Sequence, residues 1–598
     1  MALVILAAVG TAAEWTRVRA AIKTAVQWWP ERQRARALPR EELFAHLAAS
    51  QVGYTPAMVK RFSSPRRFQS FRVIREGAGT VAFEGGRPAQ EIATTTLGSV
   101  GTVWVGDFSP LAAPGRYRLE AAGMTSHPFT VDRGVFDPAL RATQRAFYFQ
   151  RAFTSIDTPH AEGPWTHGDD RALAPPGVRG GWHDAGDFSL YSASLNTALF
   201  WMLEAYSDFR PMADDTNIPE SGNGIPDLLD EARWGLEWLL SVQDESGGFR
   251  NSTCLEQYGP YGTNFPEKAQ AYRAGEVGTL ATARAVGSLA YGSTVWRLFD
   301  PGFADRALQA AHRGVRYLDL HPEHSDGPTC PAYRAEGDSH VGQQTRMFAA
   351  AGMLLATGEE RYREDFERNF EAPDWDPSYM RVGGFAAQLY MRAPAGDPAR
   401  KASLARWLRE RASRARAAGD QDPFQRSAPT HWGSIGAGFT RTGSSSARRC
   451  LDDGRLAQAD CDQALANLHH ALGRNPLGFA YLSGLPGVTR GRIHAFHHWF
   501  AALRAAPFLP PGMVAGGPNA APDPNDTSRP LARPIPIWGY WGDPAFPRDR
   551  ETPYEARYTD NDSWCTNEVS LDWQASSLYS LYLAQWLGQT PGGDSLGR

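Results

Sequence analysis

From residue 139 onward, the chain is dominated by segments in which apolar residues recur at helical spacing. In one of them, Leu229, Ala232 and Leu236 follow the helix-start residues Pro226 and Asp227 at intervals of three or four. The same spacing predicts helices over about 139–152, 190–207, 225–243, 275–299, 303–319, 339–356, 359–370, 377–391, 399–418, 427–441, 456–473 and 566–587. About twelve helices joined as six hairpins close naturally into two rings. We therefore expect residues 139–590 to form an (α/α)6 barrel, with loops at one end free to form a groove.

A different pattern precedes this region. Short alternating runs such as Phe71–Val73, Val103–Val105 and Tyr117–Leu119 are separated by turn clusters such as Gly85-Gly86. Short strands at this spacing are typical of a small β-sandwich. We place that domain at residues 47–135.

The first 46 residues belong to neither predicted domain. Residues 2–13 are apolar, but they are too few to cross a bilayer, which needs about 20 residues. Arg17, Arg19 and Lys23 follow the apolar stretch, whereas a secretory signal carries its basic residues before it. We interpret residues 1–46 as an atypical export signal followed by a helix, with a plain N-terminal helix as the alternative.

The cysteines bear on the compartment. No C-x-x-C spacing occurs among Cys254, Cys330, Cys450, Cys461 and Cys565, so neither a zinc ribbon nor a redox motif is indicated. Cys450 and Cys461 bracket a short segment and could form a disulfide in an oxidising compartment. With the apolar start, this favours a secreted or periplasmic protein.

Two carboxylates stand out in the stretch Gly180–Tyr191. Asp184 and Asp187 are separated only by Ala185 and Gly186, and a helical pattern follows them. The carboxylates should therefore lie at the mouth of a helix and point outward. The alternative is an Asp-rich helix cap that serves a salt bridge or a calcium ion.

Net charge and tryptophan content limit the classes of ligand that the chain is expected to bind. The net charge of -4 gives no support for binding nucleic acid, which requires a basic face. The 19 tryptophans supply flat apolar rings of the kind that stack on sugars, although many should lie in the core. We expect a monomer that acts on a small neutral ligand or a neutral polymer.

Several further motifs occur in order along the chain. They are Gln51-Val52-Gly53-Tyr54, Gly181-Trp182-His183-Asp184-Ala185-Gly186-Asp187-Phe188, Ile218-Pro219-Glu220-Ser221-Gly222-Asn223-Gly224-Ile225-Pro226-Asp227, His431-Trp432-Gly433-Ser434, Leu472-Gly473-Arg474-Asn475-Pro476-Leu477-Gly478, Gly516-Gly517-Pro518-Asn519 and Thr566-Asn567-Glu568-Val569-Ser570-Leu571-Asp572-Trp573. Together they resemble glycoside hydrolase family 9, the inverting β-1,4-glucanases, in the branch that carries an N-terminal immunoglobulin-like domain. The resemblance runs from about residue 48 to 588.

The resemblance implies three catalytic carboxyl groups. Asp187 would be the general base, Asp184 its partner on the same water, and Glu568 the general acid. Inversion needs a carboxylate that activates water on one face of the sugar and a protonated carboxyl on the other, about 6.5–9.5 Å apart. Glu568 must hold its proton near neutral pH, which burial beside aromatic rings would favour. The residues expected to contact substrate are Trp182, Tyr191, Trp432, His497, His498, Trp499 and Tyr558.

The chain departs from the family at two places. Trp499 stands where the family usually has an arginine after two histidines, so hydroxyl recognition there should change, because tryptophan offers one N–H and a stacking face. Members of this branch also often bind a structural zinc through two cysteines and two histidines. His183 is present, but Ala152 and Trp165 occupy the expected cysteine places and His167 is displaced by one. We therefore expect no required cofactor and no zinc, while the aspartates near 227 and 560 could hold calcium.

Three functions stay open at this point. The first is endo-acting, inverting hydrolysis of β-1,4 bonds in cellulose or cello-oligosaccharides. The second is exo-acting hydrolysis of cello- or glucosamine oligosaccharides, which differs only in how loops close one end of the groove. The third is a carbohydrate-binding relic without turnover, which the presence of all three expected carboxyl groups argues against.

Overall fold

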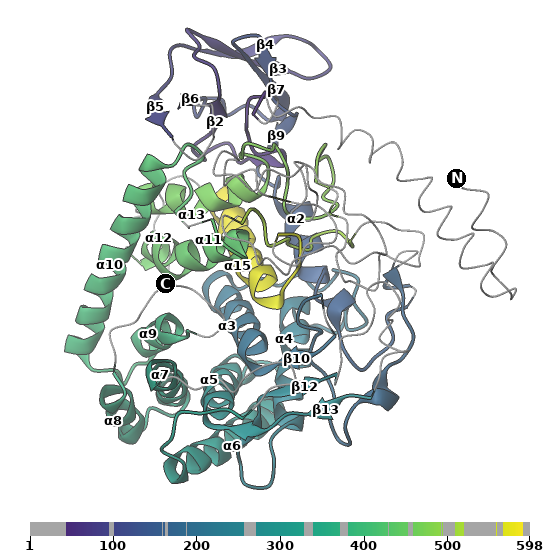
Figure 1. Ribbon diagram of the computed structural model, residues 1–598, viewed down its shortest axis with the longest axis vertical. Helices are drawn as coiled ribbons and strands as arrows, with labels where there is room; N and C mark the ends of the chain where they lie inside the picture. The colour runs from purple at the N-terminus through teal and green to yellow at the C-terminus, as the bar shows by residue number, and fades with distance from the viewer. Residues whose placement is uncertain are drawn as a thin grey trace, which may run out of the picture.

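The computed structural model describes residues 44–94, 101–157, 159–161, 165–186, 188–255, 271–327, 339–370, 381–427, 430–452, 458–491, 493, 509–519, 558 and 566–589. Figure 1 shows a smaller β domain above a larger helical domain. The predicted fold class, a helical barrel preceded by a β-sandwich, is confirmed.

The N-terminal domain consists of two facing sheets. One has the order β1-β9-β7-β3-β4, with β8 beside β7, and the other has the order β2-β6-β5. Its strands are β1 (Gly53–Tyr54), β2 (Arg61–Ser64), β3 (Phe71–Arg75), β4 (Val81–Gly85), β5 (Gln90–Ala93), β6 (Thr102–Asp107), β7 (Gly115–Ala121), β8 (Met124–Thr125) and β9 (Phe129–Val131). Along β7, Tyr117, Leu119 and Ala121 are buried while the residues between them are less so. Alternation of this kind gives each sheet one apolar face, and the two faces form the core of the sandwich.

The helical domain begins at Asp137. Its helices are α2 (Asp137–Arg145), α3 (Ser192–Phe209), α4 (Asp227–Ser241), α5 (Thr279–Trp296), α6 (Pro301–Leu320), α7 (Ser339–Thr357), α8 (Glu360–Arg368), α9 (Gly383–Arg392), α10 (Pro398–Gln421), α11 (Ser434–Thr442), α12 (Arg448–Asp452), α13 (Gln458–Ala471) and α15 (Leu571–Gln589). Short elements lie between them: η3 (Tyr148–Gln150), η5 (Arg171–Leu173), β10 (Leu190–Tyr191), β11 (Phe249–Arg250), β12 (Ser252–Cys254), β13 (Arg273–Ala274), β14 (Val277–Gly278) and the π-helix η7 (Gly443–Ala447).

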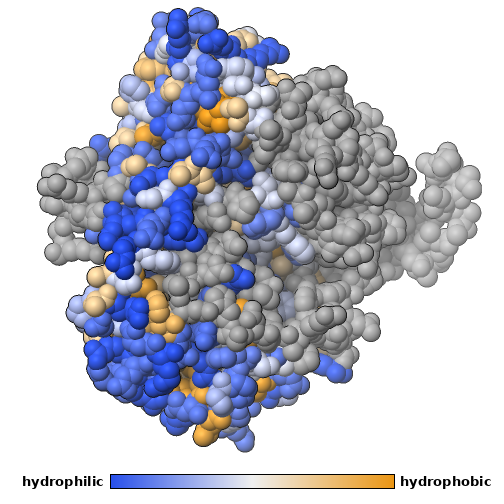
Figure 2. Space-filling view, turned by 60° about the vertical axis from the view of Figure 1, so that its left-hand side comes forward, coloured by the Kyte–Doolittle hydropathy of each residue, from blue (hydrophilic) through white to orange (hydrophobic). Residues whose placement is uncertain are grey.

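Burial separates the helices into two rings. In the inner ring, α15 packs on α3, α3 on α5, α5 on α7 and α7 on α9, while α11 packs on α15. Almost every residue of α3 and α5 is buried, as expected for helices surrounded by others. Outer helices such as α6, α8 and α10 bury one stripe only. The opposite faces are polar, and the surface turned forward in Figure 2 is mostly hydrophilic.

A buried charge cluster joins the inner helices at one end of the barrel. Glu204 and Asp208, in the last turns of α3, are fully buried. Arg392 at the end of α9 donates to Glu204 at 2.9 Å and pairs with Asp208, which also pairs with Arg448 of α12. Tyr291 and Tyr579 donate their hydroxyls to Glu204 and Asp208 at 2.7 and 2.8 Å. The cluster therefore connects α3, α5, α9, α12 and α15 through paired charges.

Side-chain hydrogen bonds hold the β domain against the barrel. Gln51 Nε2 donates to the carbonyls of Gly478 and Arg490 at 2.9 and 3.0 Å, and Gln51 Oε1 accepts from the N–H groups of Thr489 and Arg490. The ring of Tyr54 lies 4.7 Å from that of His469 on α13. Both donors and acceptors of the buried Gln51 amide are thus satisfied by the barrel, which fixes how the two domains meet.

A disulfide joins Cys450 and Cys461, with an S–S distance of 2.06 Å and Cα atoms 5.0 Å apart. The pairing considered from the sequence is therefore confirmed.

Within the described part of the chain, none of the helices combines the length and apolar character needed to cross a bilayer.

Candidate active site

The predicted carboxylate turn is closed by hydrogen bonds between its two sides. The N–H of Asp184 donates to the carbonyl of Ser189 at 2.9 Å, and Nδ1 of His183 lies 2.8 Å from the carbonyl of Phe188. The side chain of Asp184 is half-buried, and the Ser194 hydroxyl donates to it from the first turn of α3. Asp187 belongs to the same turn but lies outside the described residues. The turn therefore fixes Asp184 at the N-terminal end of an inner helix.

Glu568 lies in a second fixed segment, just before α15. Its carbonyl accepts from the N–H of Gly516 at 2.8 Å, and the carbonyl of Thr566 accepts from Gly517 at 2.7 Å. The Glu568 side chain is half-buried, whereas its neighbours Asn567 and Val569 are buried. Alternation of burial in an extended segment turns the carboxyl group away from the core.

These two segments meet in the structure. The N–H of Leu571, three residues after Glu568, donates to the carbonyl of Asp184 at 3.0 Å. The N-terminal ends of α3 and α15, which pack side by side, thus bring the two predicted acidic positions to the same end of the barrel (Figure 1). The juxtaposition expected of the two segments is present, while the catalytic role of each residue stays a prediction.

Three glycines bring further segments to this end. A Cβ atom at Gly433, Gly436 or Gly516 would lie within about 2 to 3 Å of the Trp573 ring in the first turn of α15. Because these positions have no side chain, the segments around residues 433 and 516 can lie directly on that ring. Trp432, next to Gly433, keeps 45% of its surface exposed, which leaves an indole face open at the site.

At α15, burial also acts on a neighbouring carboxyl group. Asp572 is buried and accepts from the Ser570 hydroxyl at 2.5 Å. Burial raises the pKa of Asp572 to about 6, although the Ser570 hydroxyl opposes this change. The second acid of the Glu568 segment is thus used to cap the start of α15.

Two of the residues expected to contact substrate are buried in this structure. Trp182 is fully buried, and its indole N–H donates to Glu231 of α4 at 2.7 Å, so it is part of the core. Tyr558 is also fully buried, with Phe479 and Tyr481 against its ring at centroid distances of 5.3 and 5.0 Å. Neither side chain presents a face to a sugar in this structure.

The remaining expected contacts have mixed outcomes. Tyr191 is half-buried immediately before α3, where its carbonyl accepts from Ser194 at 3.4 Å, close to the carboxylate turn. His497, His498 and Trp499 lie outside the described residues. Ser194 was not predicted as a site residue, although its place in the first turn of the helix after Asp187 is a signal that could have suggested it.

The zinc site of the family does not fit the residues present. Ala152 is fully buried and has no ligand atom, and Trp165 packs its ring on Phe149. His167 and His183 both direct Nδ1 to a carbonyl at 2.8 Å. Tetrahedral zinc needs four ligands, and neither histidine joins a metal-sized group of three donors within the described chain.

The acidic group that does reach metal-sized dimensions lies beside α4. Carboxylate oxygens of Asp214, Asp227 and Asp230 lie within 4.8 Å of one another. Oδ2 of Asp227 accepts from the N–H and hydroxyl of Thr216, both at 2.6 Å, whereas its buried Oδ1 has no hydrogen-bond partner in the described chain. Burial and the neighbouring carboxylates raise the pKa of Asp230 to about 7. An all-oxygen donor set of this kind suits calcium.

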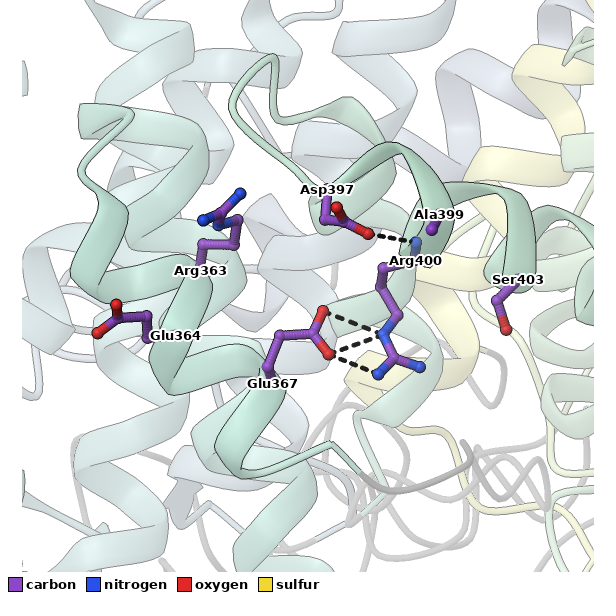
Figure 3. Close-up of a pocket in the computed structure, with 7 residues that line it drawn as sticks. All are labelled: Arg363, Glu364, Glu367, Asp397, Ala399, Arg400 and Ser403. Atoms are coloured by element: carbon purple, nitrogen blue, oxygen red, sulfur yellow. Dashed lines mark hydrogen bonds and ion pairs between the residues drawn. The ribbon is translucent and has the colours of Figure 1, made fainter.

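A large cavity elsewhere lacks the features of an active site. It has a volume of about 630 Å³ and lies between α8 and α10, as Figure 3 shows. Glu367 accepts from Arg400 in a bidentate pair, and Asp397 caps α10 by accepting from the N–H of Arg400 at 2.7 Å. Glu367 of α8 is thus held by an arginine of the neighbouring α10, and Asp397 by the backbone of its own helix, so we assign both acids to structure.

An (α/α) barrel with acidic segments meeting at one mouth and an exposed tryptophan beside them is the arrangement expected of a carbohydrate-cleaving enzyme. Comparison with known families agrees. The sequence profile of glycosyl hydrolase family 9 matches residues 136–581, and that of the cellulase N-terminal ig-like domain matches residues 46–126. The chain therefore belongs to glycosyl hydrolase family 9, and it is a glycoside hydrolase preceded by an immunoglobulin-like domain.

Among characterised relatives, a xyloglucan-specific endo-beta-1,4-glucanase of Bacteroides ovatus is 28% identical over 79% of this chain and 82% of its own. Endoglucanase D of Acetivibrio thermocellus is 25% identical over 90% of this chain and 83% of its own. Among solved structures, a metagenome-derived family 9 endoglucanase superposes with a TM-score of 0.75 at 25% identity, over 90% of this chain and 99% of its own.

Proposed function

We propose that the enzyme hydrolyses internal β-1,4 bonds of a glucan, with inversion at the anomeric carbon. The observation that carries the proposal is the hydrogen bond from Leu571 to Asp184, which holds the carboxylate turn beside the Glu568 segment. The family 9 match and the endoglucanase names of the relatives support the substrate class.

In the proposed mechanism the turn supplies the base. Asp187, with Asp184 on the same water, removes a proton as the water attacks the anomeric carbon. Glu568 donates its proton to the leaving oxygen from the opposite face, so the new bond forms opposite the one that breaks. The Ser194 hydroxyl donates to Asp184 and so fixes the position of its carboxyl group. Trp432 offers its exposed ring for stacking on the sugar chain.

The test is a product profile on β-1,4 oligosaccharides of increasing length, with anomers followed by proton NMR. We expect cleavage of internal bonds and α-configured product as the first anomer. A β-configured first product would contradict inversion, and release of one sugar or disaccharide from chain ends alone would favour the exo-acting alternative. A parallel assay with xyloglucan asks whether side-chain substitution of the glucan is accepted.

A Glu568→Gln variant identifies the acid. Glutamine keeps the shape but cannot donate a proton to the leaving group, so we expect kcat on carboxymethyl cellulose to fall about 10²- to 10⁴-fold. Asp572→Asn is the matched control, since Asp572 lies on the same segment but is buried against Ser570. If Glu568→Gln kept wild-type turnover, another group would have to be the acid.

We also propose that calcium binds between Asp214, Asp227 and Asp230. A divalent cation would offset the repulsion of three close carboxylates and satisfy the buried Oδ1 of Asp227. Dialysis against EDTA should lower the Tm by about 5 °C or more, and calcium but not magnesium should restore it. An Asp227→Asn variant should show a low Tm that calcium does not change; a calcium response equal to that of the wild type would place the ion elsewhere.

The enzyme is further proposed to work outside the cytoplasm. The Cys450–Cys461 disulfide supports this, because such bonds persist in oxidising compartments. Polymeric glucan substrates are likewise met outside the cell. Fractionation of expressing cells, with the protein detected in the medium or periplasm, is the test.

A further inference from the structure

The ligand set expected for a structural zinc beside the carboxylate turn is incomplete in this chain, and His183, one of its expected members, contacts the turn directly. His183 directly precedes Asp184, and its imidazole crosses the base of the turn to the carbonyl of Phe188 at 2.8 Å. The main chain of His183 is tied as well, because its N–H donates to the carbonyl of Gln150 at 2.8 Å. Any displacement of this ring therefore moves Asp184.

The hydrogen bond to Phe188 determines the tautomer of His183. A carbonyl oxygen can only accept, so Nδ1 carries the proton. In the neutral ring, Nε2 is then a bare acceptor. It faces Oδ2 of Asp170 at 3.7 Å, and both side chains have 0% exposure. Nε2 of His183 has no hydrogen-bond partner within the described chain. Among the described side chains none bonds to the Asp170 carboxyl group, although the backbone N–H groups of Phe153, Thr154 and Asp170 act on it and partly oppose the effect of burial on its pKa.

Two acceptors that face each other inside a protein repel unless one of them carries a proton. A buried ion pair would need both groups charged, and burial opposes this on both sides. Burial lowers the pKa of His183 to about 4 and raises that of Asp170 to about 7. Over the range between these values the favoured state is a neutral imidazole beside a protonated carboxyl group.

We propose that Asp170 is a positioning residue, whose protonated carboxyl group donates to Nε2 of His183 and so holds the catalytic turn in place of a metal ion. The 3.7 Å separation is longer than a hydrogen bond, so the proposal requires the Asp170 carboxyl group to move toward the imidazole. Asp170 then links the loop before η5 to the turn that carries Asp184, through one imidazole. The role assigned to the turn rests on the function proposed above.

Two substitutions at Asp170 test whether its side chain acts as a hydrogen-bond donor to His183. Asp170→Asn keeps a donor, since the amide N–H₂ can replace the acid O–H, whereas Asp170→Leu keeps the approximate size and removes the donor. We expect kcat of Asp170→Asn within about twofold of the wild type and kcat of Asp170→Leu lowered about 10- to 100-fold, with KM changed much less, because the turn is misplaced. Asp169→Asn is the control: Asp169 is the exposed neighbour that accepts from the N–H of Arg171.

A pH series gives a readout that does not depend on turnover. The folded pKa of Asp170 lies above its ordinary value of 3.8, so the wild type loses stability as pH rises from about 4 to about 7. The charged neighbour that acts on Asp170 is Asp169, whose carboxylate also raises the pKa of Asp170. Asp170→Asn should remove this part of the decline in Tm, and Asp169→Asn should keep it.

Metal analysis completes the test. Purified wild-type enzyme should contain no stoichiometric zinc by mass spectrometry and should keep its activity in 1,10-phenanthroline. Zinc at one per chain, or an Asp170→Asn variant as impaired as Asp170→Leu, would overturn the proposal. Full activity and an unchanged pH series in Asp170→Leu would do so as well. If the wild type cleaves no β-glucan, the function proposed above fails, while the pH series and the metal content still decide the role of Asp170.

Discussion

Acidic groups lie at both ends of helix α3, and they differ in burial and in the groups that contact them. Glu204 and Asp208 at its C-terminal end are fully buried and paired with Arg392 and Arg448. Asp184, in the turn before its N-terminal end, is half-buried and is held by neutral groups, the Ser194 hydroxyl and the backbone of Ser189. From Ser192 to Asp208 the helix spans about 24 Å. We therefore expect the acids paired with guanidinium groups to stabilise the barrel and Asp184 to serve catalysis.

An Asp184→Asn variant tests most directly whether the acids at the two ends of α3 have different roles. The amide keeps the size of the side chain but removes the charge that acts on water, so kcat should fall about 10²- to 10⁴-fold. The Tm should change little, because Asp184 is half-buried and its contacts are hydrogen bonds that an amide also forms. Steady-state kinetics and thermal unfolding on the same sample measure both. A variant that unfolds without a specific loss of turnover would make Asp184 a structural residue like Asp208.

The opposite outcome is expected at the other end of α3. Asp208→Asn removes the nearest carboxylate from the buried guanidinium of Arg448 and leaves only Glu204 and Asp452, at 3.6 and 3.7 Å. Full unpairing of a buried charge costs about 3 to 5 kcal/mol, so we expect a loss of stability up to that size. Urea unfolding should report this loss, while kcat of the folded enzyme at low temperature should stay near the wild-type value.

Asp215→Asn is the matched control for Asp208→Asn. Asp215 also pairs with an arginine, Arg141, but its side chain is 66% exposed. Exposed pairs contribute about 0 to 1 kcal/mol, so this variant should be nearly neutral. Equal losses in the two variants would mean that burial does not distinguish the ends of α3.

The helices could be predicted from the sequence, because the spacing of apolar residues within one segment indicates a helix. The helices were predicted because their apolar residues recur every three or four positions, and α7 (Ser339–Thr357) lies within one residue of the predicted range. Residues 427 and 430–433 were wrongly included in the helix that begins at Ser434. There the chain runs through Gly433 in a left-handed conformation with φ 73°, which apolar spacing does not reveal.

The site was predicted less completely. Contacts between side chains from distant segments cannot be recognised in the sequence of one segment alone. Trp182 adjoins His183 and Asp184 in sequence, yet its ring points into the core toward Glu231. A strand or extended turn sends successive side chains to opposite sides, so adjacency in sequence does not mean a shared surface. The Asp170–His183 contact and the Arg448–Asp208 pair likewise join residues whose partners only the fold identifies.

The smallest expected effect is a difference between the two ends of α3 in how the free energy of unfolding depends on pH. Burial by itself would raise the pKa of Asp208, but the guanidinium groups of Arg448 and Arg392 outweigh it and lower the pKa to about 2. A folded pKa below the ordinary value of 3.8 means that the stabilisation is complete above about pH 4 and is lost as pH falls toward 2. The difference corresponds to about 2 kcal/mol. Urea unfolding at pH 5 and pH 2.5 should therefore show a smaller decline in Asp208→Asn than in the wild type, whereas Asp184→Asn should keep most of the wild-type decline. If Asp184→Asn removed the larger share instead, the paired acids would not be the ones whose charge stabilises the barrel.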